Sequence, residues 1–172
     1  PPRGGERLSE WMEASSEFLV GDAPGTDRAF QMFLKSKKYP AVTVYTSADE
    51  LRNNLGNWQV EKVESGLKSK SNAVHAFKDR KMSQIADIGL MIWDCESAGT
   101  LSNVIDLLGQ GKNCFIWVAP DSDLYQFDNS ASLEKWMENY SEVRDEALKR
   151  LSTFQKREAK RVKQDFQPEL FD

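Results

Sequence analysis

Short apolar runs alternate with segments of helical spacing along most of the chain, and this alternation constrains the fold more than any other feature. The runs at 88–93 and 114–118 are apolar, as expected of central strands in a parallel sheet that is covered on both faces. Between them, residues 100–108 have the spacing of a helix, which Gly109 or Gly111 would end. This order predicts an α/β fold, a Rossmann-like open parallel sheet with helices on both faces.

The same patterns predict the other elements. Strands are expected at 18–20, 41–45 and 60–63, and helices at 6–16, 29–34 and 73–85. Beyond Pro120 the pattern changes to charged helices, a short one at 133–140 and a longer one at 143–163, which cannot continue past Pro168. We therefore expect a Rossmann-like domain at 1–120, a C-terminal helical extension at 121–166 and a tail at 167–172.

The composition excludes several classes of protein. With 172 residues and a formal net charge of −4 at pH 7, the chain is long enough for one core and does not attract nucleic acid over its whole surface. No apolar run approaches the length of a membrane span, and no signal peptide is recognisable. Cys95 and Cys114 have the surroundings of buried thiols and lack the spacing of a zinc site or a disulfide framework. We expect a cytoplasmic protein without a metal or a cofactor.

The loop at 21–27 directly follows a predicted strand and opens a predicted helix. Ligands of open α/β sheets bind at the carboxyl ends of the strands, and a helix start offers backbone N–H groups to a phosphate. The glycines permit a sharp turn, and the aspartates suit a sugar hydroxyl, a base edge or a structural N–H. The candidate ligand-binding residues are Gly21, Asp22, Ala23, Gly25, Thr26 and Asp27. The alternative is a plain turn in which Thr26 caps the helix.

A second loop, at 93–100, also lies after a predicted strand and before a predicted helix. Its hydroxyl and N–H groups can face an anion. Asp94 and Glu96 are candidate catalytic residues, because a carboxylate pair near a strand end can transfer protons. The alternative is that Asp94 or Ser97 only caps the helix. The candidate ligand-binding residues of this loop are Ser97, Ala98, Gly99 and Thr100.

Four motifs in combination carry a resemblance to a known superfamily. They are Gly21-Asp-Ala-x-Gly-x-Asp27, Lys78-Asp79-x-x-Met82 with Ala86-Asp87, Trp93-Asp-x-x-Ser97-x-Gly99-Thr100, and Gly111-Lys112. Over residues 18–119 the chain resembles the SLOG superfamily, which groups the DNA-processing protein DprA with the lonely-guy phosphoribohydrolases, and most of all its small bacterial branch. The resemblance implies a Rossmann-like fold that binds a nucleotide or nucleotide-derived ligand. Members either cleave an N-glycosidic bond or sense a nucleotide signal, some of them in stress or phage defence.

The chain departs from that superfamily in two places. Relatives begin with a strand that ends in a Gly-Ser-Arg type of loop, and we expect this wall of the ligand site to lie outside the sequence shown. The phosphoribohydrolases carry Gly-Thr-x-x-Glu, whereas here Gly99-Thr100 is followed by Asn103. An amide cannot act as a nucleophile or general base, and Asp106 lies one turn deeper along the helix. This departure favours binding over catalysis.

Several other residues have two interpretations each. His75, the single histidine, is either catalytic or a part of a helix surface or core. Lys78 and Arg80 either reach a phosphate or are solvated. Trp93 and Trp117 fall in predicted strands and are expected in the core. The basic run at 149–163 is either a solvated helix with i, i+4 pairs or a contact for nucleic acid or a partner.

The preferred hypothesis is a sensor or regulatory protein whose partner is a nucleotide-like small molecule. One alternative is an N-glycosidase or phosphoribohydrolase that acts on nucleoside monophosphates through Asp94 or Glu96. Another is a scaffold tied to replication through the tail. The sequence leaves open whether the protein is a homo-oligomer.

The tail segment Gln-Pro-Glu-Leu-Phe is similar to the peptides with which bacterial proteins dock on the replicative sliding clamp. In such a peptide Gln167 fixes the register, and Leu170 and Phe171 enter an apolar pocket. The alternative is that both apolar residues cover the domain's own core. If the tail docks, immobilised clamp captures the protein, and Leu170→Ala with Phe171→Ala abolishes capture; capture that these substitutions leave unchanged would contradict docking.

Overall fold

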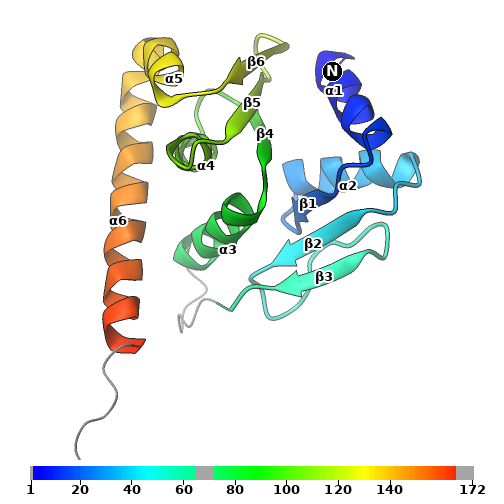
Figure 1. The fold of residues 1–172 in the computed structure, drawn as a ribbon, viewed down its shortest axis with the longest axis horizontal. Coiled ribbons are helices and arrows are strands. Elements are labelled where there is room, and N and C mark those ends of the chain that lie inside the picture. The colour runs from blue at the N-terminus through cyan, green and yellow to red at the C-terminus, as the bar shows by residue number, and fades with distance from the viewer. Residues whose placement is uncertain (1, 65–71, 166–172) are drawn as a thin grey trace, which may run out of the picture.

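The computed structural model describes residues 2–64 and 72–165 of the chain. Helices and strands alternate through most of this range (Figure 1). In chain order the elements are α1 (Pro2–Glu13), β1 (Phe18–Gly21), α2 (Thr26–Ser36), β2 (Val42–Thr46), β3 (Gln59–Lys62), α3 (Asn72–Ile85), β4 (Ile88–Trp93), α4 (Ala98–Gly109), β5 (Asn113–Val118), β6 (Asp123–Phe127), α5 (Ser130–Trp136), the 3-10 helix η1 (Met137–Tyr140) and α6 (Ser141–Asp165). The predicted mixed α/β class with C-terminal helices is confirmed.

The strands form two three-stranded sheets that are mostly parallel and flanked by helices. The first has the order β1-β2-β3 and is parallel throughout, with Phe18 opposite Val42 and Thr43 opposite Gln59. The second has the order β4-β5-β6, in which β4 and β5 are parallel and β6 is antiparallel to β5. Figure 1 shows the two sheets beside each other, with α6 along the far side of the second.

The prediction that 88–93 is a central strand was wrong. β4 is an edge strand of the second sheet, and the side chain of Ile88 at its start is 43% exposed. The strand is nevertheless apolar because α4 packs on it and its outer edge faces an apolar cavity. The other apolar run, β5, is central as predicted, since it lies between β4 and β6.

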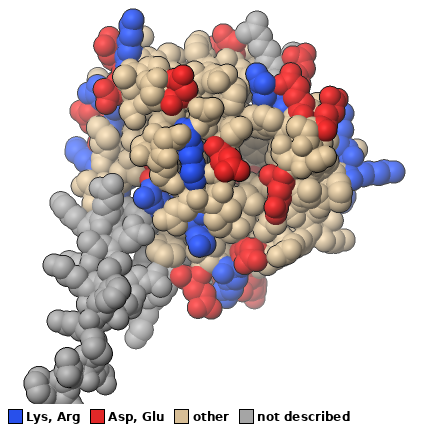
Figure 2. Space-filling model, viewed as in Figure 1, with Lys and Arg blue, Asp and Glu red and all other residues tan. Residues whose placement is uncertain are grey.

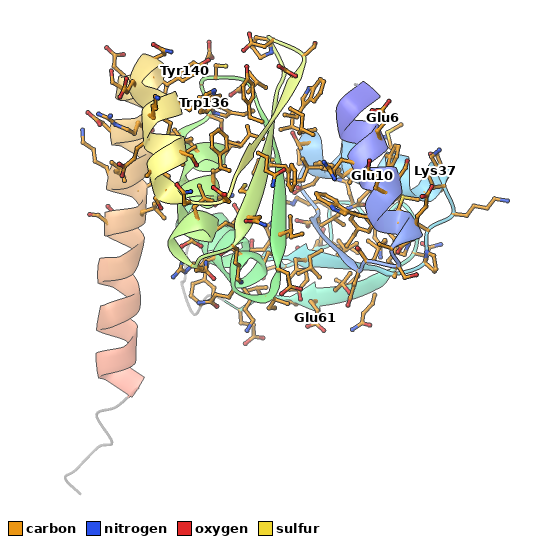
Figure 3. All side chains as sticks on the ribbon, turned by 45° about the horizontal axis from the view of Figure 1, so that its top comes forward. Glu6, Glu10, Lys37, Glu61, Trp136 and Tyr140 are labelled. Carbon is orange, nitrogen blue, oxygen red and sulfur yellow. The ribbon has the colours of Figure 1, made fainter. Side chains whose placement is uncertain are left out.

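The core of the second sheet forms around α4. Leu101, Val104 and Leu107 of this helix are buried against strand residues such as Cys114 and Ile116. Trp93 and Trp117 are 1% and 5% exposed, which confirms them as core residues. The rings of Trp136 and Tyr140, labelled in Figure 3, stack with each other at 5.3 Å and with Trp93 at 5.5 and 4.9 Å. α6 packs on α4, so the C-terminal helices share this core.

The first sheet has a smaller core, and α1 links it to the second sheet. Leu34 of α2 and Val44 of β2 are fully buried, with Val20 and Val42 beside them. Trp11 of α1 stacks edge-on against Phe115 of β5, with ring centroids 5.4 Å apart. Cys114 and Phe115 are adjacent in β5 and therefore point to opposite faces. Because Cys114 packs with α4 and Phe115 with α1, the two helices cover opposite faces of the second sheet.

One predicted helix end agrees with the structure, and two other features differ from the prediction. Gly25 rather than Thr26 is the N-cap of α2, and it makes no side-chain cap bond. α4 ends with Gln110 as its C-cap, followed by Gly111 at φ +73°, a backbone conformation that favours glycine. β6 was not predicted, and it opens the segment at 121–166 that was expected to be helical.

Within the described ranges, no helix is both long enough and apolar enough to cross a membrane.

Truncation of the α4 core tests this packing. Leu101 is 0% exposed, so Leu101→Ala leaves a cavity and is expected to lower the free energy of unfolding by about 2–5 kcal/mol. Leu148→Ala, at a position on α6 that is 47% exposed, is the matched control and is expected to change it by less than about 0.5 kcal/mol. Urea denaturation measures both, and equal effects would contradict the assigned core.

Candidate functional site

A cavity of about 630 Å³ lies between the two sheets, a volume typical of small-molecule sites. It has two chemically different parts. The part that we call the polar end is lined by Gly21, Ala23, Thr26, Asp27, Arg52, Lys78, Asp79, Thr100 and Asn103. The part that we call the apolar slot is lined by Leu8, Trp11, Phe18, Leu19, Val20, Ile88, Gly89, Leu90, Met91, Ile92 and Leu107.

Lys78 is the centre of the polar end. Only 4% of this residue is exposed, and its Nζ lies 3.2 Å from Asp79 Oδ1 and 3.7 Å from Asp27 Oδ2. The amide of Asn103 donates to the other oxygen of Asp79 at 3.4 Å. α2, α3 and α4 therefore each contribute to one connected group of polar side chains. A lysine is rarely this buried unless it is paired, and here two carboxylates pair with it.

The loop after β1 is shaped around this group. A Cβ at Gly21 would overlap the Asp27 carboxylate and the Lys78 ammonium, so a side chain there would have to displace this ion pair. Gly25 has φ +90°, which lets the chain turn into α2. Asp27 Oδ2 accepts a hydrogen bond of 3.0 Å from the N–H of Ala23. The N–H of Ala23, a candidate ligand-binding residue, thus already binds a carboxylate of the protein.

Asp22 points away from the cavity into a buried pair with Arg52. Its carboxylate accepts from the Thr46 hydroxyl at 2.7 Å and from Arg52 Nη2 at 2.5 Å and Nε at 3.1 Å. Burial alone would raise the pKa of Asp22, but the hydrogen bonds from Arg52 and Thr46, together with the charge of Arg52, lower it below its ordinary value. Asp22 therefore fixes the segment before β3 onto the end of β1.

Asp94, a candidate catalytic residue, binds the backbone of its own loop. Its Oδ1 accepts from the N–H groups of Glu96 at 2.9 Å and Ser97 at 2.7 Å, and these bonds lower the pKa of Asp94. Cys95, which lies between Asp94 and Glu96, has φ +68°. Asp94 and Glu96 are both exposed, and neither lines the cavity. The alternative interpretation of Asp94, as a residue that orders the start of the helix, matches these contacts.

Ser97 is the N-cap of α4. Its hydroxyl oxygen accepts from the N–H of Thr100 at 3.3 Å and from the Thr100 hydroxyl at 3.1 Å. Ala98 is 3% exposed and belongs to the core, and a Cβ on Gly99 would lie 3.4 Å from Arg150 of α6. Of this loop's four candidate ligand-binding residues, Thr100 lines the cavity.

Asp106 is engaged away from the polar end. Its carboxylate pairs with Arg80 and accepts from the Ser83 hydroxyl at 2.5 Å and from Gln110 Nε2 at 2.9 Å. Arg80 Nε is buried without a hydrogen-bond partner. Neither Arg80 nor Asp106 lines the cavity, so neither is in place to reach a ligand there.

The structure thus brings together half of the predicted ligand-binding residues. Those that line the cavity are Gly21, Ala23, Thr26, Asp27 and Thr100; those that do not are Asp22, Gly25, Ser97, Ala98 and Gly99. Lys78 and Asp79 were predicted beside the loop at 21–27 only as motifs of the SLOG resemblance, and Asn103 was weighed only as the replacement of a glutamate; their mutual contacts were not predicted. The contacts join α2, α3 and α4, and the spacing of these residues in the sequence carries no signal of such contacts between helices.

Three other predictions concern residues that lie wholly or partly outside the described part of the chain. The side chain of His75 and the tail residues Gln167, Leu170 and Phe171 lie outside the part that is described. In the basic run, Arg150 forms an i, i+4 pair with Glu146 at 2.6 Å, as the solvated-helix interpretation expects; side chains from 154 onward are not described.

The rest of the described surface offers no stronger site. Figure 2 shows acidic and basic residues interspersed over the face in view. Glu6 and Glu10 of α1 and Lys37, labelled in Figure 3, border a shallow groove between α1 and α2, away from the strand ends. Among the described side chains, no three His, Cys, Asp or Glu residues group so as to hold a metal ion.

No protein-family model, curated protein or solved structure matches the chain.

The Asp22–Arg52 pair predicts an acid-sensitive fold. Because the pKa of Asp22 is lowered by folding, the pair contributes stability above the unfolded pKa of about 3.9, and this contribution is lost as the pH falls through the folded pKa. Removing Arg52 leaves the buried Asp22 carboxylate without its charged partner. Arg52→Met is therefore expected to lower the free energy of unfolding by about 3 kcal/mol at neutral pH. Asp22→Asn is expected to make the free energy of unfolding depend less on pH in the acid range, which we call the acid limb of the stability profile.

Urea denaturation over a pH series measures these effects. Asp128→Asn, at an exposed position, is the control and should retain the wild-type profile. An acid limb that Asp22→Asn leaves unaltered would contradict the role given to the pair.

Proposed function

We propose that the polar end of the cavity binds a nucleotide-derived ligand, chiefly through its sugar hydroxyls, and that the protein is a sensor or regulatory protein rather than an enzyme. The observation that carries this proposal is the buried Lys78 held between Asp27 and Asp79 on the cavity wall. Lys78 contacts one oxygen of each carboxylate and Asn103 donates to the second oxygen of Asp79, which leaves Asp27 Oδ1 and the second lone pairs of the Asp79 oxygens. The remaining acceptor capacity suits the vicinal hydroxyls of a ribose.

The charges at the polar end favour hydroxyls over phosphate. Asp27 and Asp79 bring two negative charges against the one positive charge of Lys78, while Arg52 is neutralised by Asp22. Asp27 also occupies the N–H of Ala23. A phosphate group therefore has to approach from the side of the Thr26 hydroxyl and the first N–H groups of α2, where the helix dipole favours an anion. The apolar walls offer contacts to the flat base.

Binding without turnover is supported by the same arrangement. Asn103, on the cavity wall, has an amide where a nucleophile or general base would need a carboxylate. Asp94 and Glu96 lie outside the lining, and Asp94 is held by its own loop. Asp27 and Asp79 are engaged with Lys78, which occupies them in an ion pair. The resemblance to the SLOG superfamily supports the proposal, since Gly21, Asp27, Lys78, Asp79 and Thr100 are among the residues that carry it.

Calorimetric titration with a panel of ribonucleosides, their 5′-monophosphates and the 2′-deoxy forms tests this function. We expect the ribo form of the preferred base to bind at least about tenfold more tightly than its deoxy form, since a hydrogen bond to a charged group contributes about 1.5–3 kcal/mol. Asp27→Asn and Asp79→Asn are each expected to weaken binding by a similar factor. Asp128→Asn is the charge-matched control and should bind as the wild type does.

Two results would overturn the proposal. One is equal affinity for ribo and deoxy forms with no effect of either cavity substitution, in variants whose circular dichroism shows them folded. The other is base release from a nucleotide that Asp94→Asn or Glu96→Gln abolishes, because that would make the protein a hydrolase.

A further inference from the structure

Arg52 offers one edge of its guanidinium group to the cavity. The residue lines the cavity, and 31% of its side chain is exposed. Its Nε and Nη2 donate to the two oxygens of Asp22, at 3.1 and 2.5 Å, and because Asp22 is fully buried this edge is turned inward. Among the described residues, no hydrogen bond uses Nη1. The N–H groups of Nη1 and the second N–H of Nη2 therefore form a donor edge that stays available for a ligand.

The segment that carries Arg52 holds this donor edge in a fixed position. The backbone N–H of Arg52 also donates to Asp22, at 3.2 Å, and the side-chain amide of Asn53 donates to the Asp22 carbonyl at 2.8 Å. Gln31, which is 0% exposed, donates to the carbonyl of Asn53 at 3.2 Å. A group that is already held by such bonds loses little conformational freedom when a ligand binds. Arg52 is therefore a preorganised donor.

The charges around Arg52 favour a neutral acceptor over an anion. Arg52 and Lys78 are outweighed by the carboxylates of Asp22, Asp27 and Asp79, so the polar end has a net negative charge. The hydrogen bond to Asp22 is the main cause that raises the pKa of Arg52, and the nearby charges of Asp27 and Asp79 add to it. The donor edge therefore lies beside the polar end and suits a neutral group with two neighbouring acceptor atoms.

Among the common nucleobases, the 6-oxopurines guanine and hypoxanthine carry such a pair of acceptors. The O6 and N7 atoms of guanine both accept, and a guanidinium group matches them in a bidentate contact. Adenine combines the N7 acceptor with an N6 donor, which would face the N–H groups of Arg52. Cytosine presents a donor at N4, and uracil has a single acceptor at O4. The pattern of donors on Arg52 therefore distinguishes between bases.

We propose that Arg52 determines the base specificity of the site, and that the ligand is a 6-oxopurine ribonucleoside or its nucleotide. The O6 and N7 atoms of the base accept from Nη1 and Nη2 of Arg52. This inference rests on the proposed function, in which Asp27 and Asp79 bind the ribose hydroxyls. Asp22 is the positioning residue, because it holds one edge of the guanidinium group and leaves the other edge for the base.

Calorimetric titration of the whole protein with guanosine, inosine, adenosine and 7-deazaguanosine tests this assignment on the unaltered chain. Guanosine and inosine are expected to bind at least about tenfold more tightly than adenosine, which is within the range of one bidentate contact between arginine and guanine. 7-Deazaguanosine lacks the N7 acceptor and is expected to bind at least about fivefold more weakly than guanosine.

A conservative substitution tests the same contact from the side of the protein. Arg52→Lys keeps a positive charge beside Asp22 but removes the second donor edge. In a variant that circular dichroism shows to be folded, the preference for guanosine over adenosine is expected to disappear. Asp128→Asn, at an exposed position, is the control and should retain the preference. The nucleoside series needs no variant, so it decides the question even if Arg52→Lys does not fold.

Equal affinity for guanosine and adenosine, or for guanosine and 7-deazaguanosine, would overturn the assignment. 2′-Deoxyguanosine separates this failure from failure of the proposed function. A preference for ribose without a preference for the base would overturn the role of Arg52 alone. A preference for the base without one for ribose would support the role of Arg52 and contradict the proposed ribose contacts. Absence of binding by every nucleoside of the series would overturn both.

Discussion

The ammonium of Lys78 holds the polar end of the cavity together. It lies on α3, which packs against α4, and its partner Asp27 lies on α2 beside the first sheet. Bringing an ammonium and two carboxylates out of water is costly, and close pairing offsets that cost. The pair occupies the space that a side chain at position 21 would need, and Gly21 leaves that space open. Together with the Trp11–Phe115 contact, this ion cluster ties the first sheet to the second.

The cavity beside this ion cluster has two kinds of wall. At the carboxyl ends of the strands, the charges that hold the halves together also present acceptors to a ligand. Along the strands, the walls are apolar.

The positions of helices and strands could be predicted from the sequence to a large extent because burial follows period 2 or 3.6. β4 was located at 88–93, its observed bounds. Its place at a sheet edge could not be predicted, because a strand with covered faces has the same composition whether or not its edge is paired. β6 escaped prediction because Asp123 and Gln126 interrupt its apolar residues.

The candidate site was predicted in part for a similar reason. Position after a strand located the loops that contain Asp27 and Thr100, and the fold brings both to the cavity. Whether an aspartate in such a loop faces a ligand or the protein depends on distant partners. Arg52 and Thr46 turn Asp22 inward, and two backbone N–H groups engage Asp94. Lys78 joins the site through tertiary contacts that no local pattern encodes.

The most direct measurement of the central claim is an NMR titration of the whole protein with D-ribose, the smallest probe that carries the hydroxyls in question, against 2-deoxy-D-ribose. The account predicts that ribose shifts the amide signals of Gly21, Ala23, Asp27, Thr100 and Asn103 in a saturable manner, and that the deoxy sugar does so far more weakly. Equal shifts by both sugars, or shifts confined to residues outside the cavity, would contradict it.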